Sequence, residues 1–269
     1  MPHSTTRDGV RVYYEEHGRG EPVLLAYGIG GNAGMWEPNI GALSAGHRLI
    51  LWEPRGHARS DSPEDPKKVT FAHWVWDLHD LMDHLELERA VVGGLSLGGG
   101  IATRFTLAHP TRVRALLIID SSSASGLPLG VDNIVMRAKS IEVTLKGGMD
   151  AMAEFAIESN PNVAGRIKLD PSARNEIFDY YRRLTPIGYA NALRALLQMD
   201  YITDRLGEIT APTLLVCGDE DPSLGPMREI QKRIAHARFA LLSLAGHFAN
   251  RDQPAAFNRA VVEFLSGLA

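Results

Sequence analysis

The chain has 269 residues, of which 45% are hydrophobic, and its 28 basic and 32 acidic side chains give a formal net charge of −4. This composition is ordinary for a globular enzyme with a sizeable core, and the charge balance gives no electrostatic footprint for nucleic acid or an anionic membrane surface. A single cysteine, Cys217, rules out an intramolecular disulfide and fits a reducing compartment.

The first seven residues lack the apolar core of a signal peptide, and the longest apolar runs, such as residues 115–119, are too short to span a bilayer. We therefore expect a soluble cytoplasmic protein that binds neither nucleic acid nor membranes. The sequence does not fix the oligomeric state, and a homodimer stays open.

Up to residue 119, short β-rich runs alternate with helical periods, a pattern typical of a mostly parallel sheet covered by helices. The expected strands are residues 10–14, 23–27, 48–53, 90–92 and 113–119. The expected helices are residues 71–85, with apolar side chains three and four apart, and residues 97–109, which end before Pro110.

From residue 121 to about 206 the strand pattern stops. Four helices are expected there, at residues 131–145, 149–159, 170–184 and 189–197, the third opened by Asp170-Pro171. Strands return at residues 213–217 and 239–242, with helices at 228–234 and 254–265. The sequence therefore predicts an α/β core formed by residues 1–120 and 207–269, interrupted by a helical cap at residues 121–206.

Ser96 is the central residue of a G-x-S-x-G pattern, Gly94 to Gly98, between an expected strand and an expected helix. A serine hydroxyl is a weak nucleophile, and a sharp strand-to-helix turn presents it to a base. Glycines two residues to either side remove side chains that would clash in such a turn. A glycine-rich turn with a chance serine is the alternative, but the strand before and the helix after favour a nucleophile.

At this point the chain resembles the α/β-hydrolase family over nearly its whole length. The matching segments are residues 28–31 after a strand, residues 53–61, which are similar to D-x-R-G-x-G-x-S-D, residues 212–221, and Gly246-His247. Within the family, residues 94–99 and Met35-Trp36 are most similar to β-ketoadipate enol-lactonases and related small esterases. The resemblance implies a mostly parallel α/β-hydrolase sheet flanked by helices, with a helical cap.

In this fold a triad runs in the order serine, acid, histidine along the chain. His247 follows the last expected strand, at the sheet edge where ligand sites form, and is the expected general base. The pattern G-x-x-D, counted from Gly218, predicts Asp221 as the acid. Asp219 is expected to cap the turn instead, and Asp120, also at a strand end, is a third alternative.

The expected oxyanion hole uses two backbone N–H groups, those of Ile29 and Leu97. Tyr27-Gly28 stands where the family has His-Gly, and both residues are expected at the substrate site. Tyr27 either adds a phenolic hydrogen bond near the site or packs under the loop. The chain also departs from the family at Glu53 and Ala58, where Asp and Gly are usual, and the change to alanine is expected to alter that turn.

The insert is expected to form a lid over the site. Candidates for lining an apolar pocket are Met136, Met149, Met152, Phe155, Tyr180, Tyr181, Tyr189 and Met199, most of which are expected in the core of the lid itself. Three basic residues can pair with a substrate carboxylate, as an enol-lactone requires, although a solvated surface role is the default for each: Arg137, Lys139 and Arg166.

These patterns predict a serine hydrolase that cleaves a small carboxylic ester or lactone through an acyl-serine. A carbon–carbon bond hydrolase of the meta-cleavage type, a cofactor-free perhydrolase and a low-turnover ligand receptor on the same fold stay open. We expect no cofactor, because residues 28–31 are not G-x-G-x-x-G and no P-loop lysine is present. We expect no metal, because no histidine or cysteine cluster accompanies the acidic residues.

Overall fold

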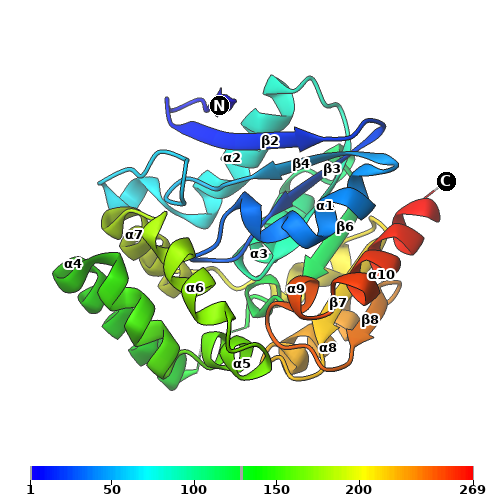
Figure 1. The fold of residues 1–269 in the computed structure, drawn as a ribbon. Coiled ribbons are helices and arrows are strands. Elements are labelled where there is room, and N and C mark those ends of the chain that lie inside the picture. Colours follow the sequence, from blue (N-terminus) through cyan, green and yellow to red (C-terminus); the bar gives the residue numbers. More distant parts are fainter. Residues whose placement is uncertain (1, 128–129, 269) are drawn as a thin grey trace.

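In the computed structural model, which describes residues 2–127 and 130–268, the chain folds around an eight-stranded sheet with the order β1-β2-β4-β3-β5-β6-β7-β8 (Figure 1). Neighbouring strands from β4 to β8 in this order are parallel, whereas β1 and β2 join one edge antiparallel. The expected mostly parallel sheet is confirmed. The predicted ranges of core and cap also take in residues 1, 128, 129 and 269, which lie outside the described residues.

All the expected strands are present. Their bounds are β1 (His3–Thr5), β2 (Arg11–His17), β3 (Glu21–Ala26), β4 (His47–Trp52), β5 (Ala90–Leu95), β6 (Val113–Ile119), β7 (Thr213–Gly218) and β8 (Arg238–Leu242). The short edge strand β1 was not expected. The predicted end of β5 at residue 92 is wrong, because Gly93 and Gly94 pair in register with Leu117 and Ile118 of β6 instead of starting the turn.

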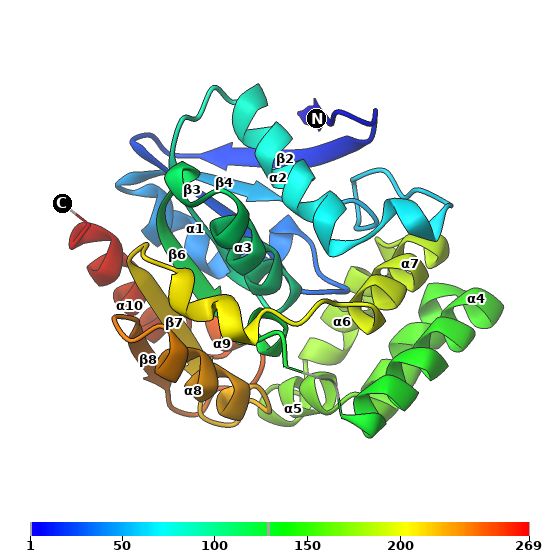
Figure 2. The ribbon, with the colours of Figure 1, turned by 180° about the vertical axis from the view of Figure 1, so that it is seen from behind.

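Helices cover both faces of the sheet. One face carries α1 (Glu37–Ser44), α9 (Ala249–Asp252) and α10 (Pro254–Ser266) (Figure 1). The other carries α2 (Phe71–His84), α3 (Leu97–Ala108) and α8 (Leu224–Arg233) (Figure 2). Short 3-10 turns join these elements at Ala33–Trp36, Pro66–Lys68, Pro110–Arg112, Ser122–Ala124 and Thr203–Glu208. The sequence did not predict α1 and α9, and α8 begins four residues before its expected start.

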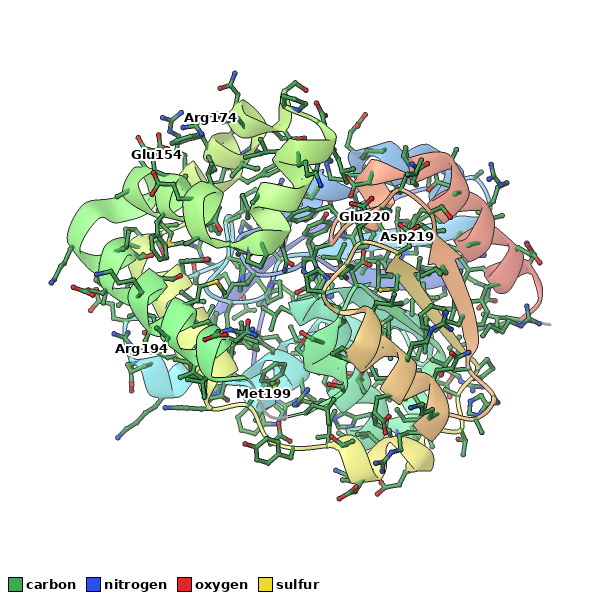
Figure 3. The ribbon with its side chains drawn as sticks, turned by 90° about the horizontal axis from the view of Figure 1, so that it is seen from below. Glu154, Arg174, Arg194, Met199, Asp219 and Glu220 are labelled. Atoms are coloured by element: carbon green, nitrogen blue, oxygen red, sulfur yellow. The ribbon has the colours of Figure 1, made fainter. Side chains whose placement is uncertain are left out.

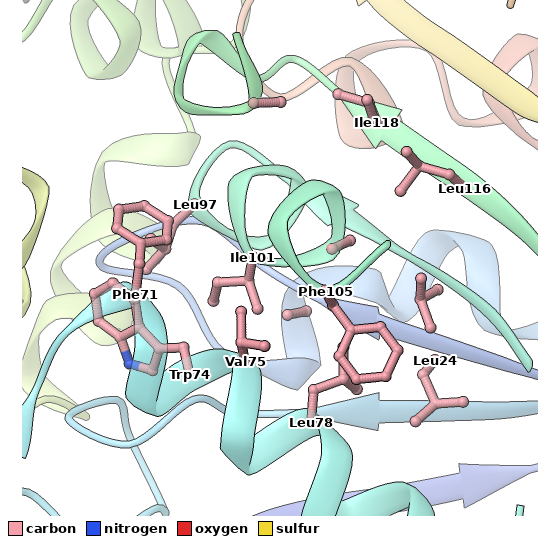
Figure 4. Packing of buried hydrophobic residues seen from close by; sticks show 14 of the residues in the cluster. Leu24, Phe71, Trp74, Val75, Leu78, Leu97, Ile101, Phe105, Leu116 and Ile118 are labelled. Atoms are coloured by element: carbon pink, nitrogen blue, oxygen red, sulfur yellow. The ribbon is translucent and has the colours of Figure 1, made fainter. Parts of the chain in front are cut away.

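The core between the sheet and helices α2 and α3 is made of large apolar side chains that are almost fully buried. Figure 4 shows Phe71, Trp74, Val75 and Leu78 of α2 beside Leu97, Ile101 and Phe105 of α3, over Leu24, Leu116 and Ile118 of the sheet. Each side chain of this size contributes about 1.5–3 kcal/mol when it leaves water. This packing holds α3 rigidly against β5, so the turn that joins them is fixed from both sides.

Between β6 and β7 the described chain is helical, as expected. Its helices are α4 (Val131–Ser159), α5 (Pro161–Leu169), α6 (Ala173–Arg182) and α7 (Pro186–Leu197), which gather together beside the sheet (Figures 1 and 2). Two expected helices are merged in α4 across a kink at Gly148, whose φ of 73° and ψ of −167° are not helical. These helices share a hydrophobic cluster of their own. We propose that residues 121–206 form a cap on the core.

Two details of the insert differ from the prediction. The sequence did not predict helix α5. Asn160 in fact caps α5 by accepting a hydrogen bond from the Asn162 N–H, and Pro161 takes the first helical position. The third expected helix begins at Ala173 and not at Asp170. On the outer surface, Arg174 of α6 pairs with Glu154 of α4 at 2.7 Å, as Figure 3 shows.

Across residues 2–127 and 130–268, no helix combines enough length with enough apolar character to cross a lipid bilayer.

Candidate active site

Ser96 occupies a strained turn between β5 and α3. Its φ of 53° and ψ of −112° lie outside the regions that residues with a side chain normally adopt, at a cost of about 1–3 kcal/mol. Hydrogen bonds hold the strained residue in place. The Ser96 N–H donates to the Ile119 carbonyl at 2.9 Å, and the Ser96 carbonyl accepts from the hydroxyls of Ser121 and Ser123 at 2.5 and 2.9 Å. The turn is therefore held by β6 and by the segment that directly follows it.

The glycines on either side of Ser96 are required by close packing against β3. A Cβ atom at Gly94 would lie 2.4 Å from the carbonyl oxygen of Ala26, and a Cβ atom at Gly98 would lie 2.3 Å from the same oxygen. Both distances are far inside van der Waals contact. The spacing of the G-x-S-x-G motif therefore reflects two points at which the turn touches the neighbouring strand.

His247 follows β8 and lies beside the carboxylate of Asp221, which follows β7. The imidazole Nδ1 is 3.1 and 3.2 Å from the two carboxylate oxygens of Asp221. Asp221 is oriented in turn by the Ser223 N–H, which donates to its Oδ1 at 2.9 Å. When Nδ1 carries the proton toward Asp221, Nε2 is left free to accept one. This is the orientation that a general base needs.

His247 and Asp221 each favour the charged form of the other. Burial opposes protonation of the His247 imidazole, but the adjacent Asp221 carboxylate outweighs it, so the pKa of His247 is raised above its ordinary value of 6.5. Burial likewise opposes ionisation of Asp221, and the neighbouring His247 outweighs that effect and lowers the pKa of the carboxyl. Asp221 therefore stays ionised and stabilises the imidazolium that forms when His247 takes a proton.

The other two carboxylates that the sequence offered have different partners. Asp120 is fully buried, and its oxygens accept hydrogen bonds from the N–H groups of Gly218 and Ala249, each at 3.0 Å. Burial, and then the charge of Asp221, raise the pKa of Asp120 well above its usual range. Asp219 is exposed after β7 (Figure 3) and accepts from the Ala245 N–H at 3.3 Å. Asp221 is the acid that contacts His247.

Two groups of described side chains have donor atoms close enough together to bind a metal ion, but the members of both groups have other partners or are protonated. They are Asp120, Cys217 and Asp221, all buried, and His79, Asp80 and Asp83 on the surface of α2. In the first group burial raises the pKa of the Cys217 thiol, which keeps it protonated, and the carboxyls have the partners given above. In the second group the carboxylates pair with Arg7 and Arg112. We assign no metal to either.

A cavity of about 400 Å³ lies between the carboxyl edge of the sheet and the helical insert. Ser96 and His247 both line it. From the insert, the candidates that line it are Met136, Tyr180, Tyr181 and Tyr189, together with Arg137 and Arg166. Met149 and Met152 instead lie in the hydrophobic cluster of the insert, and Lys139 is half exposed on the outer surface, paired with Glu142 at 2.9 Å.

The backbone N–H groups expected to form an oxyanion hole are available. Ile29 and Leu97 both line the cavity. Within the described residues, no protein group accepts a hydrogen bond from either N–H. Leu97 is the first residue of α3, where the N–H has no acceptor within the helix, and the helix N-terminus favours negative charge. Gly28 also lines the cavity and lies against the nucleophile, since a Cβ atom at Gly28 would lie 3.0 Å from the Cβ of Ser96.

Tyr27 combines the two roles that the sequence left open. Its buried ring packs edge-on against Trp36, with ring centroids 5.2 Å apart, and its hydroxyl donates to Oδ1 of Asn250 at 3.0 Å. Burial raises the pKa of Tyr27 well above 10, so the phenol stays neutral. Asn250 donates to the Met35 carbonyl and to Asn39. Tyr27 thus supports the loop that carries Ile29 and also reaches the segment just after His247.

The two departures from the family pattern in residues 53–61 are both accommodated. Glu53 is buried, and its carboxylate accepts hydrogen bonds from the N–H groups of Ala33 at 3.1 Å and Arg59 at 2.8 Å. Ala58 has a φ of 38°, in the left-handed region that favours glycine. Ala58 therefore holds a backbone conformation that glycine would adopt without strain.

Ion pairs join the insert to the segment that carries His247, a connection that the sequence did not suggest. Arg166 of α5 pairs with Asp252 at 3.1 Å, and Asp252 accepts a hydrogen bond from the Gly246 N–H at 2.9 Å. Arg251 pairs with Glu176 of α6. Two residues that follow His247, Arg251 and Asp252, are thus bound to helices of the insert, and Asp252 also holds Gly246, which precedes His247.

Comparison with known proteins finds a similar chain length and fold. Residues 21–140 match the sequence family described as alpha/beta hydrolase fold. Over 98% of both chains, the protein is 30% identical to the putative carbamate hydrolase RutD of Caulobacter sp. (strain K31) and 28% identical to the putative 2-succinyl-6-hydroxy-2,4-cyclohexadiene-1-carboxylate synthase of Bacillus subtilis (strain 168). The solved enol-lactonase of Burkholderia xenovorans LB400 is 26% identical, with a TM-score of 0.86 over 98% of this chain and 100% of that one. The likeness runs through the whole chain, including the insert.

Proposed function

The chain belongs to the α/β-hydrolase family and is a hydrolase of ester bonds, and from this premise we propose that it cleaves a small carboxylic ester or lactone through an acyl intermediate on Ser96. Asp221 and His247 complete the triad. One observation carries the proposal: Ser96, in its strained turn, and His247, oriented by Asp221, line the same cavity.

The chemistry follows from these positions. Nε2 of His247 takes the proton of the Ser96 hydroxyl as the oxygen attacks the substrate carbonyl carbon. The resulting oxyanion accepts hydrogen bonds from the N–H groups of Ile29 and Leu97, each worth about 3 kcal/mol of barrier. Collapse breaks the bond to the alkoxy oxygen, which takes the proton from His247 and leaves as the alcohol; in a lactone, this alcohol stays attached to the acyl group.

Water then completes the cycle. His247 takes a proton from a water molecule, whose oxygen attacks the acyl carbon, and the tetrahedral intermediate collapses to the carboxylic acid. The Ser96 oxygen regains its proton from His247. No cofactor is needed at any step. A cavity of about 400 Å³ suits a small substrate. The names of the carbamate hydrolase and enol-lactonase relatives support acyl-transfer chemistry at a carbonyl carbon.

The test is a screen of esters and lactones of graded size, with mass spectrometry of the intact protein during turnover. We expect hydrolysis with an acyl adduct at Ser96, and loss of both in Ser96→Ala. Ser122→Ala is the matched control, because it removes another hydroxyl from the same cavity wall and should keep the adduct. Full activity in Ser96→Ala would overturn the mechanism.

Two other outcomes would point to the alternatives. Cleavage of vinylogous diketones from ring fission, with no ester hydrolysis, would identify a carbon–carbon bond hydrolase. Release of one product per chain without turnover would identify a ligand receptor. A cytoplasmic location, a homodimer and the lack of a nucleic-acid partner remain predictions from the sequence.

A further inference from the structure

Helix α4 turns one face toward the cavity. Its cavity-lining residues are Asn133, Met136, Arg137 and Ser140, spaced as one side of a helix. Three of them are neutral, and the exception is Arg137, whose long side chain carries a cation into the cavity wall.

The guanidinium of Arg137 has no hydrogen-bond or ion-pair partner among the described residues. Its Nη1 atom is buried and makes no hydrogen bond, and no carboxylate among residues 2–127 and 130–268 lies within ion-pair distance of it. Tyr189 is close enough to influence its charge, but burial raises the pKa of that phenol well above 10, so it stays neutral. Burial also lowers the pKa of Arg137 itself, although arginine remains charged.

The other arginines around the cavity are neutralised. Arg166 is held by Asp252 and Asp170, and Arg251 is held by Glu176. Among the described residues that line the cavity, Glu176 alone carries a carboxylate, and it is already paired with Arg251. The permanently charged side chains of this described lining therefore leave one uncompensated positive charge, that of Arg137.

Arg137 as a whole is partly buried, and its Nη1 atom is enclosed. A charge removed from water without a counter-ion is costly, whereas a paired one is tolerated. An arginine fork also matches the geometry of a carboxylate, with which it forms two parallel hydrogen bonds. We propose that Arg137 binds a carboxylate on the substrate, so that the preferred substrates are esters or lactones that carry a free acid group in addition to the bond that is cleaved. This inference rests on the proposed ester hydrolysis.

The experiment compares substrates that differ only by a terminal methyl or carboxylate group. In one series the carboxylate is on the acyl side, with monomethyl succinate, glutarate and adipate set against methyl butanoate, pentanoate and hexanoate. In the other it is on the alcohol side, with 3-acetoxypropanoate and 4-acetoxybutanoate set against propyl and butyl acetate. Hydrolysis is followed in a pH-stat, which needs no aromatic leaving group.

We expect the wild-type protein to favour the carboxylate member in at least one matched pair. In Arg137→Met the ratio of kcat/KM for that pair should fall about 10- to 100-fold, the range given by hydrogen bonds to charged groups. Arg137→Lys, which keeps the charge without the fork, should lose less. The control is Lys139→Met, which removes a cation two residues away on the solvent side and should leave the ratio unchanged.

Binding separates this proposal from the proposed function. Calorimetry with Ser96→Ala should show the half-esters binding more tightly than the neutral esters, and the double variant with Arg137→Met should lose the difference. Binding of this kind without turnover in the wild type would overturn ester hydrolysis and support the role of Arg137. Hydrolysis of the neutral esters with no carboxylate preference in any pair, or a ratio unchanged in a folded Arg137→Met, would overturn the role of Arg137 alone.

Discussion

Asp120 should be essential for the position of His247 although it makes no contact with substrate. Its two oxygens accept the N–H groups of Gly218, at the end of β7, and of Ala249, two residues after His247. The carboxyl therefore joins the strand that precedes Asp221 to the loop that carries the base. Asp120→Ala leaves two buried N–H groups without an acceptor, while Asp120→Asn, with one amide oxygen, leaves one.

Each buried group without a partner costs about 1–3 kcal/mol, so Asp120→Ala should lower the free energy of unfolding by about 2–6 kcal/mol and Asp120→Asn by about half of that. Denaturant unfolding measures both, and kcat/KM for an ester should fall in the same order. Asp219→Ala is the control, because the Asp219 carboxylate is exposed and the loss of its hydrogen bond from the Ala245 N–H should cost about 0.5 kcal/mol or less. Equal stability of Asp120→Ala and the wild type would refute the reasoning.

Three further changes test other parts of the structure. His247 must be neutral to act as a base and its pKa is raised, so kcat/KM should decline as pH falls through a midpoint above 6.5. In Asp221→Asn the charge that raises the His247 pKa is lost, so this midpoint should move down and the rate should fall about 10⁴-fold. An unmoved midpoint would contradict the assignment of Asp221. Gly98→Ala places a Cβ 2.3 Å from a β3 carbonyl oxygen and should cost about 1–3 kcal/mol of stability together with activity, as unfolding curves and rates will show. Arg55→Met leaves the buried carboxylate of Asp77 without its 2.5 Å partner and should lower the free energy of unfolding by about 3–5 kcal/mol; a loss under 1 kcal/mol in urea would show that the pair is unimportant.

The sheet was predictable because its strands carry strong local signals. Continuous apolar runs such as residues 115–119 of β6 indicate burial on both faces, and the three-and-four spacing of α2 indicates a packed helix. Helices α1, α5 and α9 were not predicted. They have four to nine residues, too few for a clear period, and they form because tertiary contacts support them.

Some features of the candidate site were likewise predictable from local sequence signals, and others were not. Ser96, Asp221 and His247 each follow a strand that ends at the same edge of a parallel sheet, so spacing along the chain was enough to place them near one another. The partners of Asp120 are backbone groups 98 and 129 residues away, which no local pattern reveals. The isolation of Arg137 was equally hidden, because it depends on where every carboxylate lies in space.

The ion pairs between the insert and the histidine loop restrict how the protein can change. Arg166 and Glu176 belong to the helices that enclose the cavity, yet their partners, Asp252 and Arg251, lie within five residues of His247. A substitution that widens the cavity at α5 or α6 and disturbs these pairs also shifts the segment that positions the imidazole. Substrate range and turnover are therefore coupled at these four positions, and a variant that gains a larger substrate there should lose rate on the original one.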